Sequence, residues 1–391
     1  MLRAALAEES LRNPAFSNRP FLIVAAGKAS VAMLDACRAG TAVDHAVVAP
    51  MSHPLPDEAS VRAGEQALQL ADEARRANRQ LVVLLSGGAS AMLAAPADGV
   101  PLELKRETTR RLLASGASIH EINAVRKHLS RIKGGRLALG VACITFALSD
   151  VTDDEASSIG SGPTVADPST RDDAMRAIER TGIARALPEL VAAIARAPET
   201  PKPDDPLLAR SRFVLIGGRR TAMDGVVNAA LLAAHATIVL DEPITGDASA
   251  AGAAFAARAI AAARRIGGRA VVVASGETTV NVRGSGTGGR NQEFALGAAI
   301  ELDRIQSPVT GQRSSMALAA FGTDGIDGNS TAAGAIADET TVARARAAGL
   351  EPRQALRDND AHAFFGALGD QIVTGSTGTN VGDVFVAMID A

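Results

Sequence analysis

The sequence lacks the aromatic rings that usually stack on nucleic-acid bases. It contains no tryptophan and no tyrosine, and its ten phenylalanines are scattered. It also lacks an excess of positive charge, because 40 lysines and arginines stand against 43 acidic residues, for a net charge of −3. Nucleic-acid binding draws on both features, so no nucleic-acid partner is expected.

Cysteines and long apolar runs are scarce as well. Cys37 and Cys143 lie in apolar segments without the spacing of metal ligands, which predicts buried thiols in a reducing compartment. No apolar run reaches the ~18 residues of a membrane span. The segment MLRAALAEESLR at the start is typical of a charged helix rather than of a signal sequence. These features predict a cytoplasmic protein without a membrane partner.

Short apolar runs recur along the chain, and each ends in small or polar residues. Such runs, without alternation, are typical of strands buried on both faces of a parallel sheet. Stretches rich in alanine, arginine and glutamate, with helical periodicity, lie between them, so the sequence predicts an α/β fold. The runs occupy residues 21–26, 81–85, 144–148, 213–216, 271–274 and 317–321.

The length of 391 residues exceeds what one average core supports, so two domains are expected. Residues 197–210 contain four prolines and few apolar residues. Proline can continue neither a helix nor a central strand, so the boundary is predicted there. The predicted domains are residues 1–205 and residues 206–391.

Lys28 directly follows the first apolar run, in the segment AAGKAS. In an open parallel sheet, ligands bind beyond the carboxyl ends of the strands, where the next helix offers N–H groups to an anion. A lysine at a helix start opposes the helix dipole, so an anionic partner would explain it; a solvated lysine is the alternative. The segment is not a Walker A loop, because Leu22 and Ala29 replace its glycine and hydroxyl residue.

Two further strand ends carry candidate ligand groups. Ser86, Gly87 and Gly88 follow the run LVVLL. They form either a phosphate-cradling turn or a tight connection to a helix without a ligand. The run ITFAL leads to Asp150, the candidate metal ligand, because Mg²⁺ takes one or two carboxylates together with phosphate oxygens. Asp153 and Asp154 are interpreted as helix caps.

Basic residues crowd the stretch NAVRKHLSRIKGGRL at residues 123–137. Half of them must face solvent on any helix, so the stretch as a whole is interpreted as a solvated face. Lys133 is the exception, because the two glycines after it end the helix and would leave its ammonium group mobile and near the backbone. We treat Lys133 as a candidate phosphate ligand.

A glycine-rich loop in the second half, residues 284–289, contains a literal GxGxxG. No acidic residue follows about 20 positions later to hold a ribose, so the loop is only weakly indicative of a dinucleotide site. Arg290, at the start of the next helix, suggests a guanidinium directed at phosphate or carboxylate. Glu277 and Asn291 are candidates to line the same cleft.

Acidic residues also follow the run at residues 317–321. Asp324 and Asp327 stand among glycines there and could hold a metal, accept a hydroxyl proton or only form turns. We favour a ligand role for Asp324. The polar loop TGSTGTNVGD at residues 374–383 is expected to line the cleft as well.

These segments, in this order, resemble glycerate 2-kinases of the family whose C-terminal region is called the MOFRL domain. The resemblance implies a Rossmann-like N-terminal domain, a smaller α/β C-terminal domain and an active site in the cleft between them. It also implies that Lys28 and Arg290 are the important cations. It rests on AAGKAS, HPLPDE, LLSGGASAML, INAVRKHLSRIKGGRLA, LSDVTDD with IGSGPT, GETTVNVRGSGTGGRNQEFAL, GTDGIDGNSTAAGAIAD and TGSTGTNVGD.

The resemblance implies transfer of a phosphoryl group from ATP to the 2-hydroxyl of D-glycerate. Mg²⁺ is the expected metal, with Asp150 as its candidate ligand. Asp324 is the candidate acceptor of the hydroxyl proton. Three alternatives stay open: an NAD(P)H-dependent hydroxypyruvate reductase, a kinase that yields 3-phosphoglycerate, and a sugar-phosphate sensor without activity. The expected partners are glycerate and a nucleotide, and a homodimer is a candidate assembly.

Overall fold

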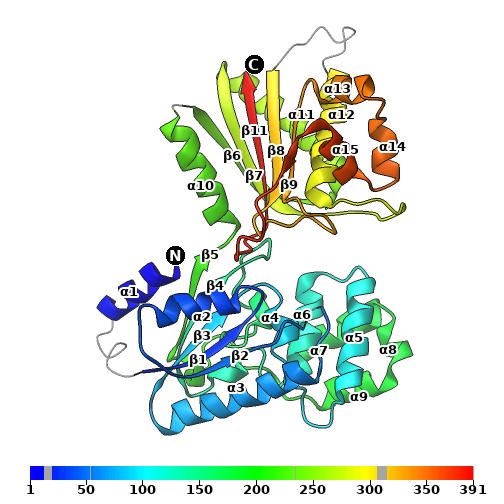
Figure 1. The fold of residues 1–391 in the computed structure, drawn as a ribbon. Coiled ribbons are helices and arrows are strands. Elements are labelled where there is room, and N and C mark those ends of the chain that lie inside the picture. The colour runs from blue at the N-terminus through cyan, green and yellow to red at the C-terminus, as the bar shows by residue number, and fades with distance from the viewer. Residues whose placement is uncertain (13–19, 53, 234, 306–314, 391) are drawn as a thin grey trace. The chain divides into compact units, whose positions relative to one another are not determined.

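The computed structural model describes residues 1–12, 20–52, 54–233, 235–305 and 315–390 (Figure 1). His53, which opens the HPLPDE segment, lies outside this part of the chain. The chain divides into two compact units, Met1–Ile216 and Gly217–Ala391. The proline-rich segment at residues 197–210 packs within the first unit, where the buried Thr200 donates a hydrogen bond to Asp167.

A five-stranded sheet in the order β2-β1-β3-β4-β5 organises the first unit. β1 pairs in parallel with β2 and β3, and β3 pairs in parallel with β4. All six residues of β1 are buried, as expected of a strand covered on both faces. The predicted parallel sheet is therefore confirmed for this unit. Its strands are β1 (Phe21–Ala26), β2 (Val43–Val48), β3 (Gln80–Leu85), β4 (Ala142–Leu148) and β5 (Ser211–Gly217).

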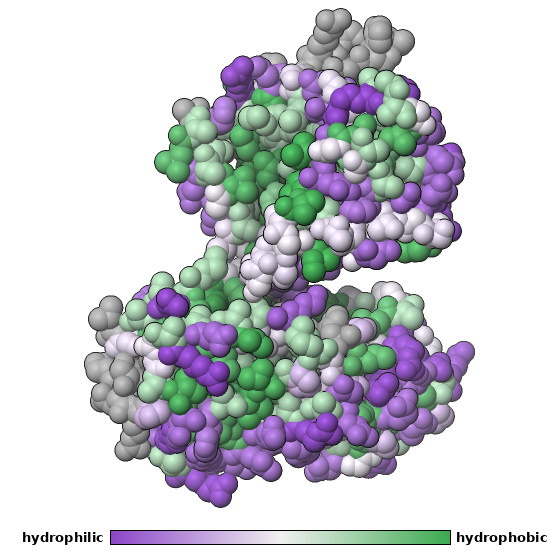
Figure 2. Space-filling model, viewed as in Figure 1, coloured by the Kyte–Doolittle hydropathy of each residue, from purple (hydrophilic) through white to green (hydrophobic). Residues whose placement is uncertain are grey.

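Helices of the first unit cover this sheet and form a second cluster beside it. α3 starts with a capping box of Asp57 and Ser60 and buries an alanine- and leucine-rich face, while hydrophilic residues cover its outer side (Figure 2). α5 to α9 share a separate core around Leu112, Val125 and Ile178. The helices are α1 (Leu2–Arg12), α2 (Ser30–Arg38), α3 (Glu58–Arg76), α4 (Ala89–Met92), α5 (Leu102–Ala114), α6 (Ile119–His128), α7 (Arg171–Arg180), α8 (Ile183–Ala186) and α9 (Pro188–Arg196), with 3-10 turns at Arg136–Ala138, Ile159–Ser161 and Pro206–Leu208.

A six-stranded mixed sheet in the order β10-β9-β8-β11-β7-β6 organises the second unit. β6 and β7 are parallel, but the last strand, β11, inserts antiparallel between β7 and β8. The expectation of a parallel sheet is wrong here, because burial on both faces gives the same apolar pattern in either strand direction. The strands are β6 (Ala236–Asp247), β7 (Arg269–Thr279), β8 (Ser315–Gly322), β9 (Gly334–Asp338), β10 (Gln371–Ile372) and β11 (Asp383–Asp390).

The core of the second unit lies between this sheet and the helices α11 and α12, and α10 packs on the sheet as well. Phe294 of α12 stacks on Phe385 of β11, with ring centroids 3.9 Å apart. None of the described helices, in either unit, is long and apolar enough to cross a membrane. The helices here are α10 (Arg219–Leu232), α11 (Ala248–Ile266), α12 (Arg290–Ile305), α13 (Thr341–Ala347), α14 (Pro352–Arg357) and α15 (Ala361–Leu368).

Candidate active site

The strand order of the first sheet creates a crevice at its carboxyl edge. The chain leaves β1 toward β2 on one side, and β3 follows on the other side of β1. Such a switch point is where open α/β sheets bind ligands. Lys28 follows β1 and Ser86 follows β3, so both lie there, and the Ala29 N–H donates to Ser86 Oγ at 2.9 Å. The Lys28 N–H donates to the Gly87 carbonyl at the same distance, 2.9 Å.

Lys28 presents a free cation at this edge. Its side chain is exposed, although Gly27 and Ala29 on either side are buried. Among the residues that the structure describes, none forms a hydrogen bond or ion pair with its ammonium group. Ser86 and Gly87, which follow β3, hold the backbone of the Lys28 loop by hydrogen bonds. The ammonium group of Lys28 stays available, which suits an anionic ligand.

Asp150 lies against the loop that follows β3. A Cβ built on Gly87 would fall 2.0 Å from Asp150 Oδ2, so only glycine leaves room for this carboxylate. The carboxyl end of β4 therefore delivers its acidic group to the same edge as Lys28. Ser86 is buried and its hydroxyl joins the two loops, while Gly88 has a left-handed backbone with φ of 84° and starts α4.

Asp153 and Asp154 do not cap a helix, contrary to the sequence-based interpretation. Asp153 accepts a hydrogen bond from the Glu155 N–H two residues later and faces His120 at 3.2 Å. Asp154 has a left-handed backbone with φ of 53°. Its Oδ1 is buried and has no hydrogen-bond partner in the described part of the chain. Such an oxygen is costly to leave unpaired, so it is a candidate cation ligand.

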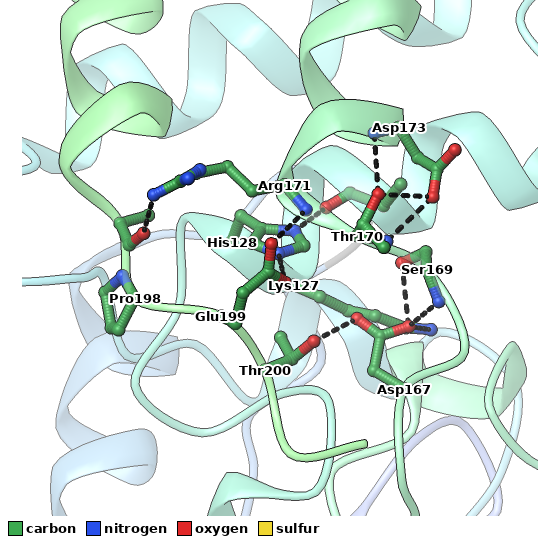
Figure 3. A network of polar contacts seen from close by, with 12 residues as sticks. Lys127, His128, Asp167, Ser169, Thr170, Arg171, Asp173, Pro198, Glu199 and Thr200 are labelled. Carbon is green, nitrogen blue, oxygen red and sulfur yellow. Dashed lines mark hydrogen bonds and ion pairs between the residues drawn. The ribbon is translucent and has the colours of Figure 1, made fainter. Parts of the chain in front are cut away.

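The basic stretch at residues 123–137 is not a solvated face. Lys127 is buried and its ammonium contacts Asp167 Oδ1 at 2.8 Å, in the network with Ser169 and Thr200 that Figure 3 shows. Burial alone would raise the pKa of Asp167, but the pairing with Lys127 and the hydrogen bonds from Ser169 lower it. Periodicity missed this burial because the partner lies 40 residues away.

Lys133 is buried too, and it is not the mobile group that the sequence predicts. Its side chain is 1% exposed, and its ammonium donates to the carbonyls of Ser90 at 2.8 Å and Gly160 at 3.3 Å. Burial lowers the pKa of Lys133 well below its usual value. A role for Lys133 in phosphate binding stays a prediction. Its ammonium contacts the backbone of α4, so such a role would act through that helix.

In the second unit, Arg290 is the first residue of α12 and makes three charge-assisted hydrogen bonds. It donates to both carboxylate oxygens of Asp383, at 2.6 and 3.1 Å, and to Glu277 at 2.7 Å. Burial raises the pKa of Asp383 to about 6, and the ion pair with Arg290 opposes that shift. The two carboxylates thus hold the guanidinium of Arg290 in one orientation.

Asn291 and the two aspartates after β8 lie around this ion pair. Asp327 accepts from the backbone and side-chain N–H groups of Asn291 and Gln292, so it caps the start of α12. Asp324 is partly exposed, and its side chain closes a turn with the Ile326 N–H. The buried Asn291 Oδ1 has no hydrogen-bond partner among the described residues, which leaves it available to a ligand.

The GxGxxG loop is occupied by the protein itself. The N–H groups of Gly284, Gly286, Thr287 and Gly288 donate to the Asn359 side chain, the Asp358 carbonyl, Asp360 and Asn329. A dinucleotide pyrophosphate would need these N–H groups free. The geometry therefore gives no support to a dinucleotide site in this loop.

Sequence reasoning singled out Arg290 but missed Asp383, its main partner. Asp383 opens β11 and pairs in register with Gly276 of β7 and Gly322 of β8, between the two strands whose ends carry Glu277 and Asp324. An acidic residue directly before the apolar run VFVAMI was the available signal. Only the antiparallel insertion of β11 brings it beside Arg290.

Comparisons with known proteins cover nearly the whole chain. A domain of unknown function (DUF4147) matches residues 1–196, and the MOFRL family matches residues 270–383. The chain is 37% identical to a D-glycerate 2-kinase of Thermotoga maritima, over 89% of this chain and 81% of that protein. It is 38% identical to an Agrobacterium vitis protein provisionally named hydroxypyruvate reductase, over 94% of this chain and 87% of that protein.

The fold matches a solved structure as well. The crystal structure of a Thermotoga maritima glycerate kinase aligns with a TM-score of 0.81 and 32% identity, over 99% of this chain and 97% of that one. The expected α/β fold class is thus confirmed. The chain belongs to the MOFRL-domain glycerate kinase family.

Proposed function

We propose that the protein transfers the γ-phosphoryl group of ATP to the 2-hydroxyl of D-glycerate, giving 2-phosphoglycerate and ADP. The observation that carries the proposal is that Lys28, whose ammonium has no partner among the described residues, lies at the same edge of the first sheet as Asp150. Phosphoryl transfer depends mainly on positioning and on neutralising charge, and these residues supply both. The family relatives named as glycerate kinases support the same reaction.

In this proposal the second unit supplies the other polar and charged groups that act on the reactants. Arg290, oriented by Asp383 and Glu277, is directed at a phosphate or carboxylate. Asp324 accepts the proton of the attacking hydroxyl while the new O–P bond forms and the bond between the β,γ-bridging oxygen and the γ-phosphorus breaks. Asn291 Oδ1 accepts a hydrogen bond from the substrate. In this proposal, residues of each unit act on the same reactants.

The divalent metal of the proposed reaction fits the acidic groups after β4. Asp150 lies at the carboxyl edge, and the unpaired Oδ1 of Asp154 belongs to the same loop. Two carboxylate oxygens with phosphate oxygens are the donor set that Mg²⁺ prefers. Bound there, Mg²⁺ would neutralise the charge of the phosphates. The group formed by Asp44, His45 and Glu73 is a poorer candidate, because Arg79 already pairs with both carboxylates, at 2.8 and 3.4 Å.

Gly87→Ala is expected to raise the Mg²⁺ concentration for half-maximal activity about tenfold or more, because the new methyl group displaces the Asp150 carboxylate. The same rise is expected for Asp150→Asn. Activity titrations with MgCl₂ measure this. Gly40→Ala is the matched control, since a Cβ there meets nothing closer than 3.9 Å. Unchanged titrations in both site variants would remove Asp150 from the metal site, and full activity in excess EDTA would refute the metal itself.

The product is expected to be 2-phosphoglycerate. With D-glycerate, ATP and Mg²⁺, coupling to enolase without phosphoglycerate mutase should then yield phosphoenolpyruvate. A signal that appears only when the mutase is added would show that the 3-hydroxyl is phosphorylated instead. No phosphorylated product from either hydroxyl would refute the kinase proposal.

The name of the Agrobacterium vitis relative keeps a reductase as the second candidate. The occupied N–H groups of the GxGxxG loop argue against it. Loss of absorbance at 340 nm with NADH or NADPH and hydroxypyruvate would favour the reductase, and it is expected to be absent.

A further inference from the structure

Three cations of the first unit lie near one another on and beside α6, two of them buried lysines and the third a partly exposed arginine. They are Lys105 on α5, Arg126 on α6 and Lys133 after α6. The Lys105 ammonium donates to the Leu129 carbonyl at 3.0 Å, where α6 ends, and Lys133 donates to the carbonyls described above. Burial, together with the smaller effect of the nearby Arg126 charge, lowers the pKa of Lys105 to about 7.

Arg126 differs from the two lysines because it has no partner. Within the described ranges, its guanidinium forms no hydrogen bond and no ion pair. Two acidic groups of this region already have partners, since Glu121 of α6 pairs with Arg180 at 2.6 Å and Asp167, just before α7, pairs with Lys127 at 2.8 Å. Burial lowers the pKa of Arg126 to about 10. Arg126 is partly exposed, so a guanidinium without an internal partner is available there to an anionic ligand.

Hydrogen bonds connect this cluster to the loops of the candidate active site. Asn123, one turn before Arg126 on α6, accepts from Ser161 Oγ at 2.8 Å, and Ser161 Oγ lies 2.7 Å from Ser90 Oγ. Ser90 belongs to α4, directly after Gly88 and Ala89. The start of α6 also meets the loop of Asp150, because His120 faces Asp153 at 3.2 Å. The unpaired guanidinium is therefore carried by a helix that is fixed to both ligand-binding loops.

We propose that Arg126 binds an oxyanion of the reactants, either the carboxylate of the acceptor or a phosphate group of the donor. A guanidinium binds either group through two parallel hydrogen bonds. The inference rests on the proposed kinase function for the identity of the reactants. It does not involve Lys28 or Arg290, so it adds a third cation to the reaction.

The test compares Arg126→Gln with Arg62→Gln, which removes an exposed arginine of α3. We expect Arg126→Gln to lower kcat/KM roughly 30-fold, the loss of a charge-assisted pair, and the control to stay within about twofold. A rise confined to the KM of glycerate identifies the carboxylate, and a rise confined to the KM of ATP identifies a phosphate. The melting temperature should stay the same, because the substitution breaks no hydrogen bond or ion pair among the described residues. A lower melting temperature with normal kinetics would overturn the proposal.

Ligand-induced stabilisation separates this inference from the kinase proposal. Melting temperatures are measured with D-glycerate, ATP or inorganic phosphate at constant ionic strength. At least one of them should stabilise the wild type clearly more than Arg126→Gln. If it does and no turnover occurs, the kinase proposal fails while the anion site stands. Equal stabilisation of both proteins by all three ligands, or none in the wild type, would overturn the anion site.

Discussion

Lys28→Ala should lower kcat/KM at least ~100-fold, which corresponds to about 3 kcal/mol of transition-state stabilisation. The ammonium is exposed and has no partner among the described residues, so its loss removes charge from the site without breaking an internal contact. The melting temperature should therefore stay the same. Steady-state kinetics with varied glycerate and ATP, together with thermal unfolding, measure both effects.

Arg38→Ala is the matched control for this variant. Arg38 ends the helix that begins just after Lys28, is 56% exposed and lies 3.9 Å from Asp35. Its loss should change kcat/KM less than about twofold, because exposed charges of this kind contribute little. Near-normal kinetics in a folded Lys28→Ala protein would exclude Lys28 from the active site.

Arg290→Lys should lower kcat about 100-fold, because one ammonium group cannot replace a fork that contacts both oxygens of Asp383 and also Glu277. Sequence reasoning alone expects no change in melting temperature. The structure indicates otherwise, since Asp383 is buried and loses a partner, at roughly 1–3 kcal/mol. Arg290→Met, which leaves that carboxylate unpaired, should lose about 3–5 kcal/mol.

The same pair predicts a pH dependence with a definite sign. Folding raises the pKa of Asp383 from 3.8 to about 6, so the folded state holds a proton that the unfolded state has released between these values. The contribution of Asp383 to stability therefore falls as pH rises through this window, by at most ~1.4 kcal/mol per pH unit. Without Arg290 the pKa rises further, so the stability deficit of Arg290→Met should shrink from pH 8 to pH 5.5.

Denaturant unfolding at several pH values tests this pH dependence. The control is a second ion pair, at the opposite end of β7 and β11. Arg269 of β7 contacts Asp390 of β11 at 2.9 Å, but both side chains are more than half exposed, at 71% and 54%. Arg269→Lys should cost less than about 1 kcal/mol, independently of pH. A deficit of Arg290→Met that is equal at pH 5.5 and pH 8 would contradict the role of Asp383. A fully active Arg290→Lys enzyme would remove the arginine from catalysis.

Local patterns in the sequence were enough to locate the strands, the main helices and the Lys28 loop. The apolar runs coincide with β1, β3, β4, β5, β7 and β8. In β1, β3, β4 and β7, burial on both faces of the sheet gives consecutive buried residues, whereas β5 is mostly partly exposed and β8 alternates. Glycine, lysine and aspartate at the ends of such runs indicate a ligand edge for the same local reason. The family resemblance then supplied the importance of Arg290, which spacing alone leaves open.

Tertiary structure decided the features that depend on residues far apart in the chain. The direction of β11, and with it the contact of Asp383 with Arg290, follows from pairing between strands and not from the apolar pattern. Whether a cation is solvated or buried depends on distant partners, as for Lys127 and Asp167. The unpaired state of Arg126 is known only once every neighbouring carboxylate has been assigned. By itself, therefore, the sequence determined the elements and the chemistry that each strand end offers, whereas packing determined which charges meet and which stay free, because electrostatic pairing depends on distance in space.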